Sequence, residues 1–379
     1  MKRILFLIVA FVILLTSIVS GQDNTLPDIS APSALLMDYS TGKILFEKNP
    51  DEKRALASVT KIMTMLLAME EIDSGRMSYD DIITASANAK SYGGSTIFLE
   101  EGEQMTVRDI LKGIAVASGN DAAVAMGEHI SGTEELFVAK MNNRAKELGM
   151  ENTNFLNCNG LDKEGHYSTA RDIAIMSREL MKHNDIFEYT TIWMDSLRNG
   201  KFTLSNTNKL VKFYNGSTGL KTGSTDDAKF CISATAKRDN MHLIAVIMGA
   251  ETSKQRQADA SSLLNYGFSA YSLDEVIKKD TVVEKLKAEK SMQNFVDVLT
   301  DSDFYSMHKK TDETEVSLKK ELKKIKVPVK KGDNAGTLNI YENGKQIGSV
   351  NLVYASDVQK VNFKFVIKNL LTSWLVTKK

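Results

Sequence analysis

The sequence predicts a mixed α/β domain over residues 25–271, a small all-β domain over residues 272–356 and a C-terminal amphipathic helix over residues 357–379. Three observations support this fold class. Strand-like segments flank a helical middle in the first domain, short strand-like runs follow from residue 272, and the tail repeats apolar residues at helical spacing. With 379 residues and 42% apolar residues, the chain has enough material for two or three such units.

The charges of the chain balance, since 48 Lys and Arg face 48 Asp and Glu. A chain without net charge offers no overall attraction to nucleic acid, so we expect no nucleic-acid partner. Cys158 and Cys231 are too few for a metal cluster, and the five histidines show no zinc-binding spacing. We therefore expect no metal site and no cofactor, and we favour two free thiols over one disulfide bridge.

The first 21 residues are typical of an export signal. Lys2 and Arg3 precede twelve uninterrupted apolar residues, and the small residues Ser20 and Gly21 suit a cleavage site. The apolar run is shorter than the roughly 18 residues that span a bilayer, although an uncleaved anchor is the alternative. The sequence thus predicts a signal peptide over residues 1–21 and a mature protein that works outside the cytoplasm.

The first domain begins with two apolar runs around the turn Ser40-Thr41-Gly42, which predict a β-hairpin over residues 34–47. Apolar residues at three-and-four spacing then predict helices, which fill the middle third of the domain, over residues 57–72, 121–130 and 134–148. The pattern returns to strands at residues 230–236 and 242–248, before a helix over residues 253–268. These strands predict a sheet built from both ends of the domain.

The second domain contains short strand-like runs at residues 281–283, 295–299 and 315–318. Its clearest element is a hairpin formed by residues 337–341 and 345–353, joined at Asn343-Gly344. This pair tolerates the positive φ angles of a tight hairpin turn. The region therefore reads as all-β.

In the tail, six apolar residues fall on one helical face: Phe363, Val366, Ile367, Leu370, Leu371 and Trp374. Lys364 and Lys368 interrupt a stretch that is shorter than the roughly 20 apolar residues of a membrane span. Residues 275–379 hold 20 Lys against 14 Asp and Glu, a net charge of +6 that favours anionic lipid. We expect a helix that lies on the membrane surface; a last helix packed on the β domain is the alternative.

The first candidate for chemistry is Ser58-Val59-Thr60-Lys61, which places a hydroxyl and an amine on one helical face. A serine becomes nucleophilic when a base removes its proton, and a lysine can do so when desolvation lowers its pKa. The same spacing occurs at residues 40–43 and 317–320, but only Ser58 opens an apolar helix.

Two further motifs follow. Ser118-Gly119-Asn120 lies at a turn between predicted helices, and Lys221-Thr222-Gly223 precedes Ser224 and Thr225 on a predicted edge strand. A glycine there lets a substrate backbone approach, and the cation and hydroxyl can hold a carboxylate. Each motif alone also suits an ordinary solvated turn or edge. Together the residues favour an acyl donor that carries a carboxylate.

The three motifs occur in this order, separated by 60 and 103 residues, and so follow the S-x-x-K, S-D-N and K-T-G set, with Gly119 in place of the central Asp. The chain resembles the low-molecular-mass penicillin-binding proteins, specifically the serine-type D-alanyl-D-alanine carboxypeptidases. Stretches at residues 55–64, 117–123, 159–162 and 167–172 add to this resemblance. It implies that residues 25–271 form a catalytic domain with a penicillin-binding/β-lactamase-like fold.

The resemblance implies a role for each matched position. Ser58 would attack the carbonyl of the terminal peptide bond, and Lys61 would accept its proton. The backbone amides of Ser58 and Ser224 would form the oxyanion hole. Ser118 would relay the proton to the leaving amine, and Lys221 would help to keep Lys61 neutral by repulsion.

The same resemblance implies the substrate contacts and partners. Asn120 would orient the substrate amide, and the terminal carboxylate would be held by Lys221 and Thr222 in a binding segment completed by Gly223, Ser224 and Thr225. The substrate would be a peptidoglycan stem peptide ending in D-Ala-D-Ala, with β-lactams as covalent inhibitors. The enzyme would work in cell-wall maturation, on the outer face of the cytoplasmic membrane.

Two other functions compete with this hypothesis. A class A β-lactamase deacylates through a glutamate three residues before a Leu-Asn pair, but the chain has Thr153, Ser261 and Ala335 at these positions. A non-catalytic cell-wall binding module would not require a serine and a lysine at helical spacing together with two distant polar motifs. Both alternatives are therefore disfavoured.

Overall fold

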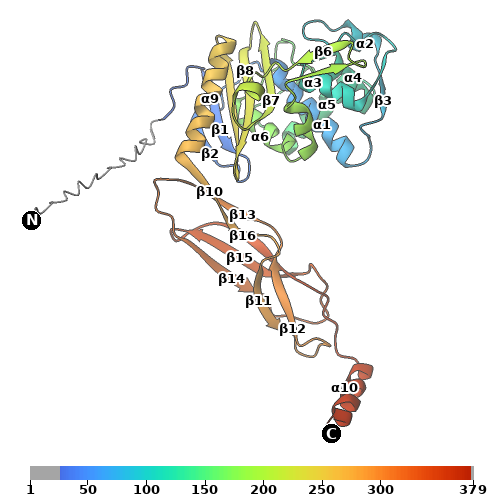
Figure 1. Ribbon diagram of the computed structural model, residues 1–379, viewed down its shortest axis with the longest axis vertical. Coiled ribbons are helices and arrows are strands. Elements are labelled where there is room, and N and C mark those ends of the chain that lie inside the picture. Colours follow the sequence, from blue (N-terminus) through green and yellow to red (C-terminus); the bar gives the residue numbers. More distant parts are fainter. Residues whose placement is uncertain (1–25, 377–379) are drawn as a thin grey trace, which may run out of the picture.

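The structure is a computed structural model that describes residues 26–376. The predicted export signal over residues 1–21 lies outside the described residues. Figure 1 shows a larger N-terminal domain, an elongated β domain and a helix at the far end of the β domain. The mixed α/β domain, the all-β domain and the C-terminal helix of the predicted fold class are confirmed.

The N-terminal domain is built on a five-stranded antiparallel sheet with the strand order β2-β1-β9-β8-β7. Its strands are β1 (Ser33–Asp38), β2 (Ile44–Lys48), β7 (Ser217–Thr225), β8 (Lys229–Arg238) and β9 (Met241–Ala250). The predicted hairpin is present, because β1 pairs with β2 around a tight turn. All ten residues of β9 are buried, as expected for the central strand of a covered sheet. The strand β7 forms one edge of the sheet.

Helices cover both faces of this sheet (Figure 1). One face carries α9 (Ser253–Ala270), and the other packs against a helical layer. That layer contains α1 (Lys61–Asp73), α3 (Val107–Ala115), α4 (Asn120–Ser131), α5 (Glu134–Glu147) and α6 (Ala170–Leu180). Threonine side chains cap α3, α5, α6 and α9 by accepting a backbone N–H from the first helical turn.

Two small antiparallel sheets lie between the predicted helices and strands of this domain, in segments where the sequence predicted no strand. They are formed by β3 (Ile82–Thr84) with β4 (Gln104–Thr106) and by β5 (Met194–Leu197) with β6 (Phe202–Ser205). Three short helices complete the domain: α2 (Ala87–Ser91), α7 (Phe187–Thr190) and α8 (Leu210–Phe213). Strands of three or four residues are too short for an alternating pattern to reveal them.

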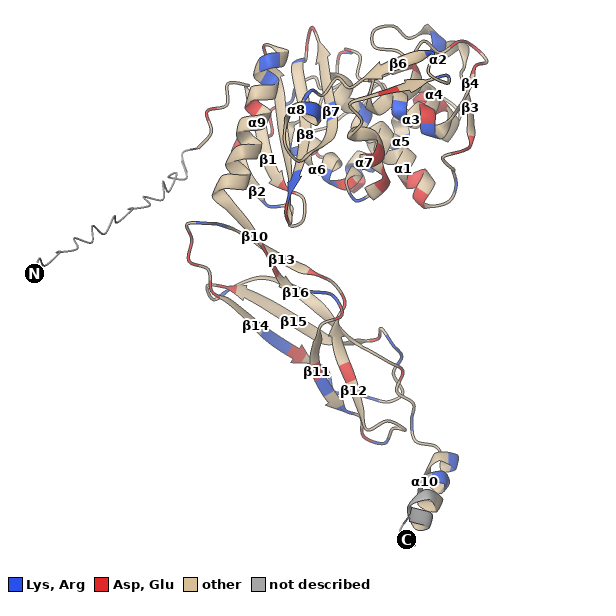
Figure 2. Cartoon of the chain, in the orientation of Figure 1, with Lys and Arg blue, Asp and Glu red and all other residues tan. Residues whose placement is uncertain are grey.

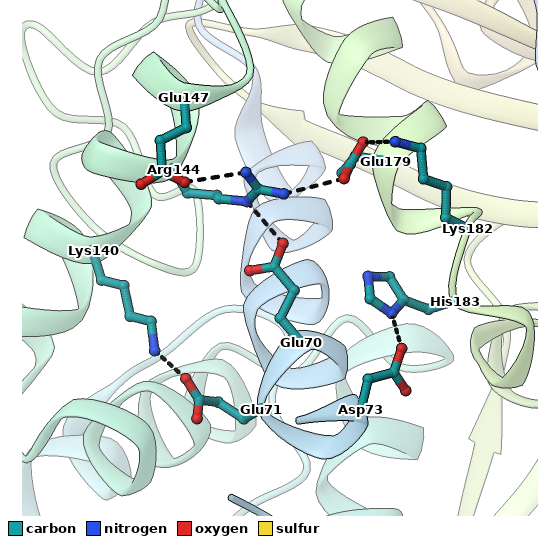
Figure 3. Close-up of polar contacts among 9 residues, drawn as sticks. All are labelled: Glu70, Glu71, Asp73, Lys140, Arg144, Glu147, Glu179, Lys182 and His183. Carbon is teal, nitrogen blue, oxygen red and sulfur yellow. Dashed lines mark hydrogen bonds and ion pairs between the residues drawn. The ribbon is translucent and has the colours of Figure 1, made fainter. Parts of the chain in front are cut away.

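A network of ion pairs holds the C-terminal end of α1 against its neighbours (Figure 3). Arg144 of α5 contacts Glu70 of α1 at 2.7 Å and Glu179 of α6 at 3.1 Å. Glu71 is buried and pairs with Lys140 of α5. The network therefore links α1, which carries Lys61 at its other end, to two further helices.

The β domain is a second five-stranded antiparallel sheet with the order β11-β12-β16-β15-β14. Its strands are β11 (Val282–Lys287), β12 (Phe295–Thr300), β14 (Val316–Leu322), β15 (Asn334–Glu342) and β16 (Lys345–Tyr354). The predicted hairpin joins β15 to β16, with φ angles of +48° at Asn343 and +79° at Gly344. A small core of residues such as Val298, Leu338 and Leu352 holds the sheet together.

The β domain meets the N-terminal domain through β10 (Tyr271–Ile277), which continues directly from α9 and pairs with β13 (Phe304–Lys309). Lys43 Nζ in the β1–β2 turn donates to the carbonyl oxygen of Met307 at 2.7 Å, and the hydroxyl of Tyr271 donates to that of Leu45 at 3.2 Å. Leu273 and Met307 also join the N-terminal core. The two domains are thus packed together at this junction.

The last described element is α10 (Phe363–Val376), which Figure 1 shows at the opposite end of the β domain from the N-terminal domain. The six apolar residues predicted on one face are all exposed. Among residues 26–376, no helix has the length and apolar content needed to cross a membrane. Elsewhere, Cys158 and Cys231 are both buried, free thiols.

Candidate active site

Ser58 lies on a 3-10 turn, Ala57–Thr60, immediately before α1. The sequence predicted a regular helix from Ala57, but Ala57 has a φ of +47°, so α1 begins only at Lys61. Two glycines press against this turn. A Cβ on Gly160 would lie 1.9 Å from the carbonyl oxygen of Ala57, and one on Gly223 would lie 2.8 Å from the Ser58 nitrogen. Only glycine at both positions allows the segments around Gly160 and Gly223 to pack directly against the serine turn.

Lys61 is fully buried, and its amine contacts three oxygens. Nζ lies 2.9 Å from Ser58 Oγ and donates at 2.6 Å to both Asn120 Oδ1 and the carbonyl oxygen of Asn159. A neutral lysine amine has two N–H groups and one lone pair. When both N–H groups are used by Asn120 and Asn159, the lone pair faces the hydroxyl of Ser58. The geometry suits a base beside a nucleophile.

Burial lowers the pKa of Lys61 to about 7, although the Asp121 carboxylate nearby opposes the shift. Burial and the repulsion from Lys61 lower the pKa of Lys221 well below its ordinary value. Desolvation is thus the largest cause of the lowered pKa at both amines, and repulsion between them adds to it at Lys221. A substantial fraction of Lys61 is neutral at pH 7 and can accept a proton.

Ser118 and Lys221 form the second half of the site. Ser118 lies between α3 and α4 with a φ of +62°, and its Oγ accepts a hydrogen bond of 2.8 Å from Lys221 Nζ. Lys221 also donates to the carbonyl oxygen of Thr222 at 2.9 Å. The turn after α3 and the edge strand β7 thus meet at the serine turn, although they are distant in sequence.

The remaining predicted residues line β7 beyond Lys221. The Thr222 hydroxyl donates to Thr207 Oγ1 at 2.7 Å, and Ser224 is exposed at the rim. The Thr225 hydroxyl donates to Asp162 at 2.6 Å and so ties the strand to the loop that carries Gly160. Asn120 is already engaged inside the protein, because its Nδ2 donates to the carbonyl oxygen of Gly93 at 2.7 Å.

A short hydrogen-bonded chain that the sequence did not reveal supports the serine turn. His166 Nδ1 accepts the backbone N–H of Leu156 at 2.9 Å, so Nε2 carries the proton and donates to Thr60 Oγ1 at 2.9 Å. Thr60 in turn donates to the carbonyl oxygen of Ala57 at 2.8 Å. Burial lowers the pKa of His166 to about 4. The neutral imidazole therefore positions the turn, a role that an isolated core histidine would not have.

Two further charged residues hold the walls of the site. Asp121 accepts the backbone N–H groups of Ile97 and Leu99 at 3.0 and 2.9 Å, which fixes the segment that follows Gly93. Arg256 of α9 is buried behind β7 and donates to the carbonyl oxygen of Gly223 at 3.1 Å. Asp121 lies next to a recognised motif, whereas a single arginine in a helix gives no signal in the sequence.

The arrangement as a whole supports acyl transfer: a hydroxyl nucleophile, a buried amine with a lone pair, a second serine and a second buried amine lie together. Within the described part of the chain, no group of three or more His, Cys, Asp or Glu side chains could hold a metal ion. The residues present are those that act by proton transfer and by covalent attack.

Comparisons with known proteins agree with this chemistry. Residues 20–252 match the D-alanyl-D-alanine carboxypeptidase family, and residues 271–360 match the C-terminal domain of penicillin-binding protein 5. D-alanyl-D-alanine carboxypeptidase DacF of Bacillus subtilis is 45% identical over 99% of both chains.

Two solved structures match different lengths of this chain. Penicillin-binding protein 5 of Haemophilus influenzae is 32% identical with a TM-score of 0.75, covering 89% of this chain and 99% of that one. The DD-transpeptidase of Streptomyces K15 is 30% identical with a TM-score of 0.60, and covers 65% of this chain and 99% of its own. From the motifs, their geometry and these matches, the chain belongs to the D-alanyl-D-alanine carboxypeptidase family.

Proposed function

We propose that this protein removes the terminal D-alanine from peptidoglycan stem peptides through an acyl-enzyme on Ser58. The observation that carries the proposal is the placement of Lys61 Nζ, 2.9 Å from Ser58 Oγ, with its two other contacts made to protein oxygens. This placement gives the serine a base in a buried site. The family assignment supplies the D-Ala-D-Ala substrate and the role in cell-wall maturation.

In the acylation step, Ser58 Oγ attacks the carbonyl carbon of the last peptide bond while its proton passes to Lys61 Nζ. The oxyanion is held by the backbone amides of Ser58 and Ser224. The C–N bond then breaks, and Ser118 relays the proton taken up by Lys61 to the amine, so that D-alanine leaves, an ester on Ser58 remains, and Lys61 is neutral again. Water hydrolyses this ester, which releases the shortened peptide and restores the serine.

The terminal carboxylate of the substrate would bind to the amine of Lys221 on β7. Lys221 is buried, no carboxylate of residues 26–376 lies within ion-pairing distance of its amine, and its pKa is strongly lowered by burial. A substrate carboxylate would stabilise the protonated amine, so binding and protonation of Lys221 reinforce each other. The Thr222 hydroxyl, which donates to Thr207 in the free protein, would turn to the carboxylate.

β-Lactams fit the same site, because they combine a strained cyclic amide with a neighbouring carboxylate. No glutamate occupies the position three residues before a Leu-Asn pair, where a class A β-lactamase carries its deacylating residue. We therefore expect penicillin to leave a long-lived acyl group on Ser58. Efficient antibiotic hydrolysis is not expected.

The purified mature protein tests this proposal directly. A peptide ending in D-Ala-D-Ala should release D-alanine, and intact-protein mass spectrometry should show one penicillin adduct. Ser58→Ala should abolish both signals. Ser317→Ala is the matched control, because Ser317 begins another Ser-x-x-Lys sequence on an exposed strand of the β domain. A stable adduct on Ser58→Ala would refute the assignment of the nucleophile.

We further propose that the mature enzyme works outside the cytoplasm with α10 lying on the membrane surface. Supporting this, α10 leaves six large apolar side chains exposed, including Phe363 and Trp374. A protein truncated after Ser356 should stay active but lose co-sedimentation with vesicles. Equal binding by the truncated and complete mature proteins would rule out the anchor, and unfolding of the truncated protein would favour a helix packed on the β domain.

A further inference from the structure

The connection between β14 and β15 carries an unusual concentration of positive charge (Figure 2). Residues 323–331, here called the lysine segment, contain Lys323, Lys324, Lys326, Lys330 and Lys331 and no acidic residue. All five lysines are exposed. None of them has a carboxylate of the described residues within ion-pairing distance. Their charges are therefore available to a partner.

The backbone of the lysine segment is held in place. Ile325, Val327 and Val329 are half-buried and pack against the β-domain core, while the lysines between and beside them face solvent. Val329 forms a bridge with Val358, and the Lys331 backbone N–H donates to Asp357 at 2.8 Å. The segment thus presents its amines from a fixed surface.

Strand register places the lysine segment at the end of the sheet that leads to α10. Leu322 at the end of β14 lies opposite Gly336, and Asn334 at the start of β15 lies opposite Val353 near the end of β16. The chain leaves β16 at this end and continues to α10. The lysines and the exposed helix therefore share one end of the β domain, the end distant from the N-terminal domain (Figure 2).

Neighbouring segments add further lysines at this end. Lys287 at the end of β11 lies opposite Phe295, and Lys290 and Lys360 lie side by side, since Ser291 bridges Lys360 and the Val361 N–H donates to the carbonyl oxygen of Lys290. Over residues 285–297, 321–334 and 354–362, nine lysines face five acidic residues. Over residues 278–282, 300–304, 309–316 and 342–346, at the opposite end, five lysines face seven acidic residues.

Protection of an edge strand explains only part of this pattern. Lysines on an exposed edge discourage pairing with another chain. Lys319 and Lys320 of β14 suit that role, and Lys320 is paired with Glu284. The lysine segment lies beyond the strand and carries no paired amine, so its charge needs a different explanation.

We propose that this end of the β domain, centred on the lysine segment, is a second membrane contact that binds anionic phospholipid headgroups. The proposal rests on the surface-lying α10 described above, because that helix brings the adjoining lysines to the headgroup layer. Lysines held near an anionic surface each strengthen binding by up to about five-fold. With the helix and the lysines both engaged, the β domain has one end fixed toward the bilayer.

The test compares two variants of the complete mature protein with equal loss of charge. The first replaces Lys324, Lys326, Lys330 and Lys331 by Gln; the control replaces Lys278, Lys279, Lys309 and Lys345 by Gln at the opposite end. Binding is measured on vesicles of pure phosphatidylcholine and on vesicles containing phosphatidylglycerol. Acylation by penicillin confirms that both variants are folded.

We expect the first variant to bind phosphatidylglycerol vesicles at least ten-fold more weakly, with a reduced salt dependence, and the control to change by less than three-fold. Binding to phosphatidylcholine reports on α10 alone and should be equal in all three proteins. An equal loss in both variants, or no loss in either, would overturn the lysine contact. If the wild-type protein did not bind phosphatidylcholine vesicles, the result would instead count against α10 as a membrane contact.

A soluble anionic polymer tests whether the lysines bind a free polyanion and not the membrane. If poly(glycerol phosphate) binds the protein truncated after Ser356 with the same lysine dependence, while vesicle binding does not depend on the lysines, the membrane contact is refuted. Competition by the polymer only at concentrations that screen all charge would agree with the lipid contact.

Discussion

Lysine residues are used in opposite ways by the two domains. In the catalytic domain, Lys61 and Lys221 are 0% and 1% exposed and lie within 3 Å of side-chain hydroxyl oxygens. In the β domain, the lysine segment holds five exposed amines without ion-pair partners among the described residues. Exclusion of water disfavours the charged form of a lysine amine, whereas a lysine in contact with water remains a surface charge.

The two domains also differ in what their cores contain. The catalytic core encloses charged and polar groups such as Lys61, Asp121 and Arg256, each tied to named backbone atoms. The β-domain core is small and apolar, and includes Val298, Leu338 and Leu352. Buried polar groups make a core sensitive to single changes, because each lost partner leaves an unsatisfied atom.

The largest effect is expected for Lys61→Ala, which should lower the rate of penicillin acylation by about 10²- to 10⁴-fold, as for loss of a general base. Lys221→Ala should mainly raise the substrate KM, because it removes the contact to the carboxylate. Lys330→Ala, on the surface of the β domain, should leave acylation unchanged. Rates are measured with a fluorescent penicillin, and a wild-type rate for Lys61→Ala would refute its role as the base.

Gly160→Ala and Gly332→Ala compare the domains with one substitution at nearly equal φ angles of +88° and +87°. At Gly160 the new methyl group would collide with the Ala57 carbonyl oxygen, so we expect a loss of roughly 3 to 5 kcal/mol in unfolding free energy, together with most of the activity. At Gly332 nothing lies within 4 Å, and about 1 kcal/mol is expected. Urea unfolding measures both changes in free energy. Equal losses would contradict the close packing of Gly160 against the serine turn.

The acylation rate should depend on pH through Lys61, whose pKa burial lowers to about 7. Only the neutral amine accepts the serine proton, and its fraction falls ten-fold per unit below the pKa. The rate should therefore be nearly constant above pH 8 and about a hundred-fold lower at pH 5. A rate that stays level between pH 5 and pH 8 would exclude a lysine base with this pKa.

The smallest effect concerns ion pairs. Arg144→Met removes the partner of Glu70, Glu147 and Glu179 (Figure 3) and should cost about 1 to 3 kcal/mol in unfolding free energy. Lys320→Met breaks an exposed pair with Glu284 in the β domain and should change the unfolding free energy much less than Arg144→Met does. Thermal unfolding measures the loss of stability in both variants. A larger loss for Lys320→Met would show that the burial of an ion pair does not determine its contribution.

The sequence was sufficient wherever a local pattern carries the information. The β1–β2 hairpin, the apolar helix after Ser58 and the Asn343-Gly344 turn follow from neighbouring residues, and the structure confirms them. The order and spacing of three motifs also indicated the family, which the comparisons confirm. The predicted domain boundaries and the roles of single site residues remain predictions.

The supporting parts of the site could not be read from the sequence, because they depend on contacts made after folding. The Asn159 carbonyl lies 98 residues from Lys61 along the chain, and nothing local indicates that it accepts the amine. The same holds for the His166 chain to Thr60, for Arg256 behind β7 and for Thr207 beside Thr222. Such partners are selected by the tertiary structure and not by residue type alone.

The two cysteines have a practical consequence. Burial raises the pKa of both thiols, most strongly for Cys158, which lies in the loop beside the site, while Cys231 lies in the central sheet. Thiol reagents attack the thiolate, so neither sulfur should react while its surroundings stay closed. The rates at which Cys158 and Cys231 become labelled would therefore report separately on opening of the active-site loop and of the sheet. The native chain thus contains its own pair of probes for local unfolding.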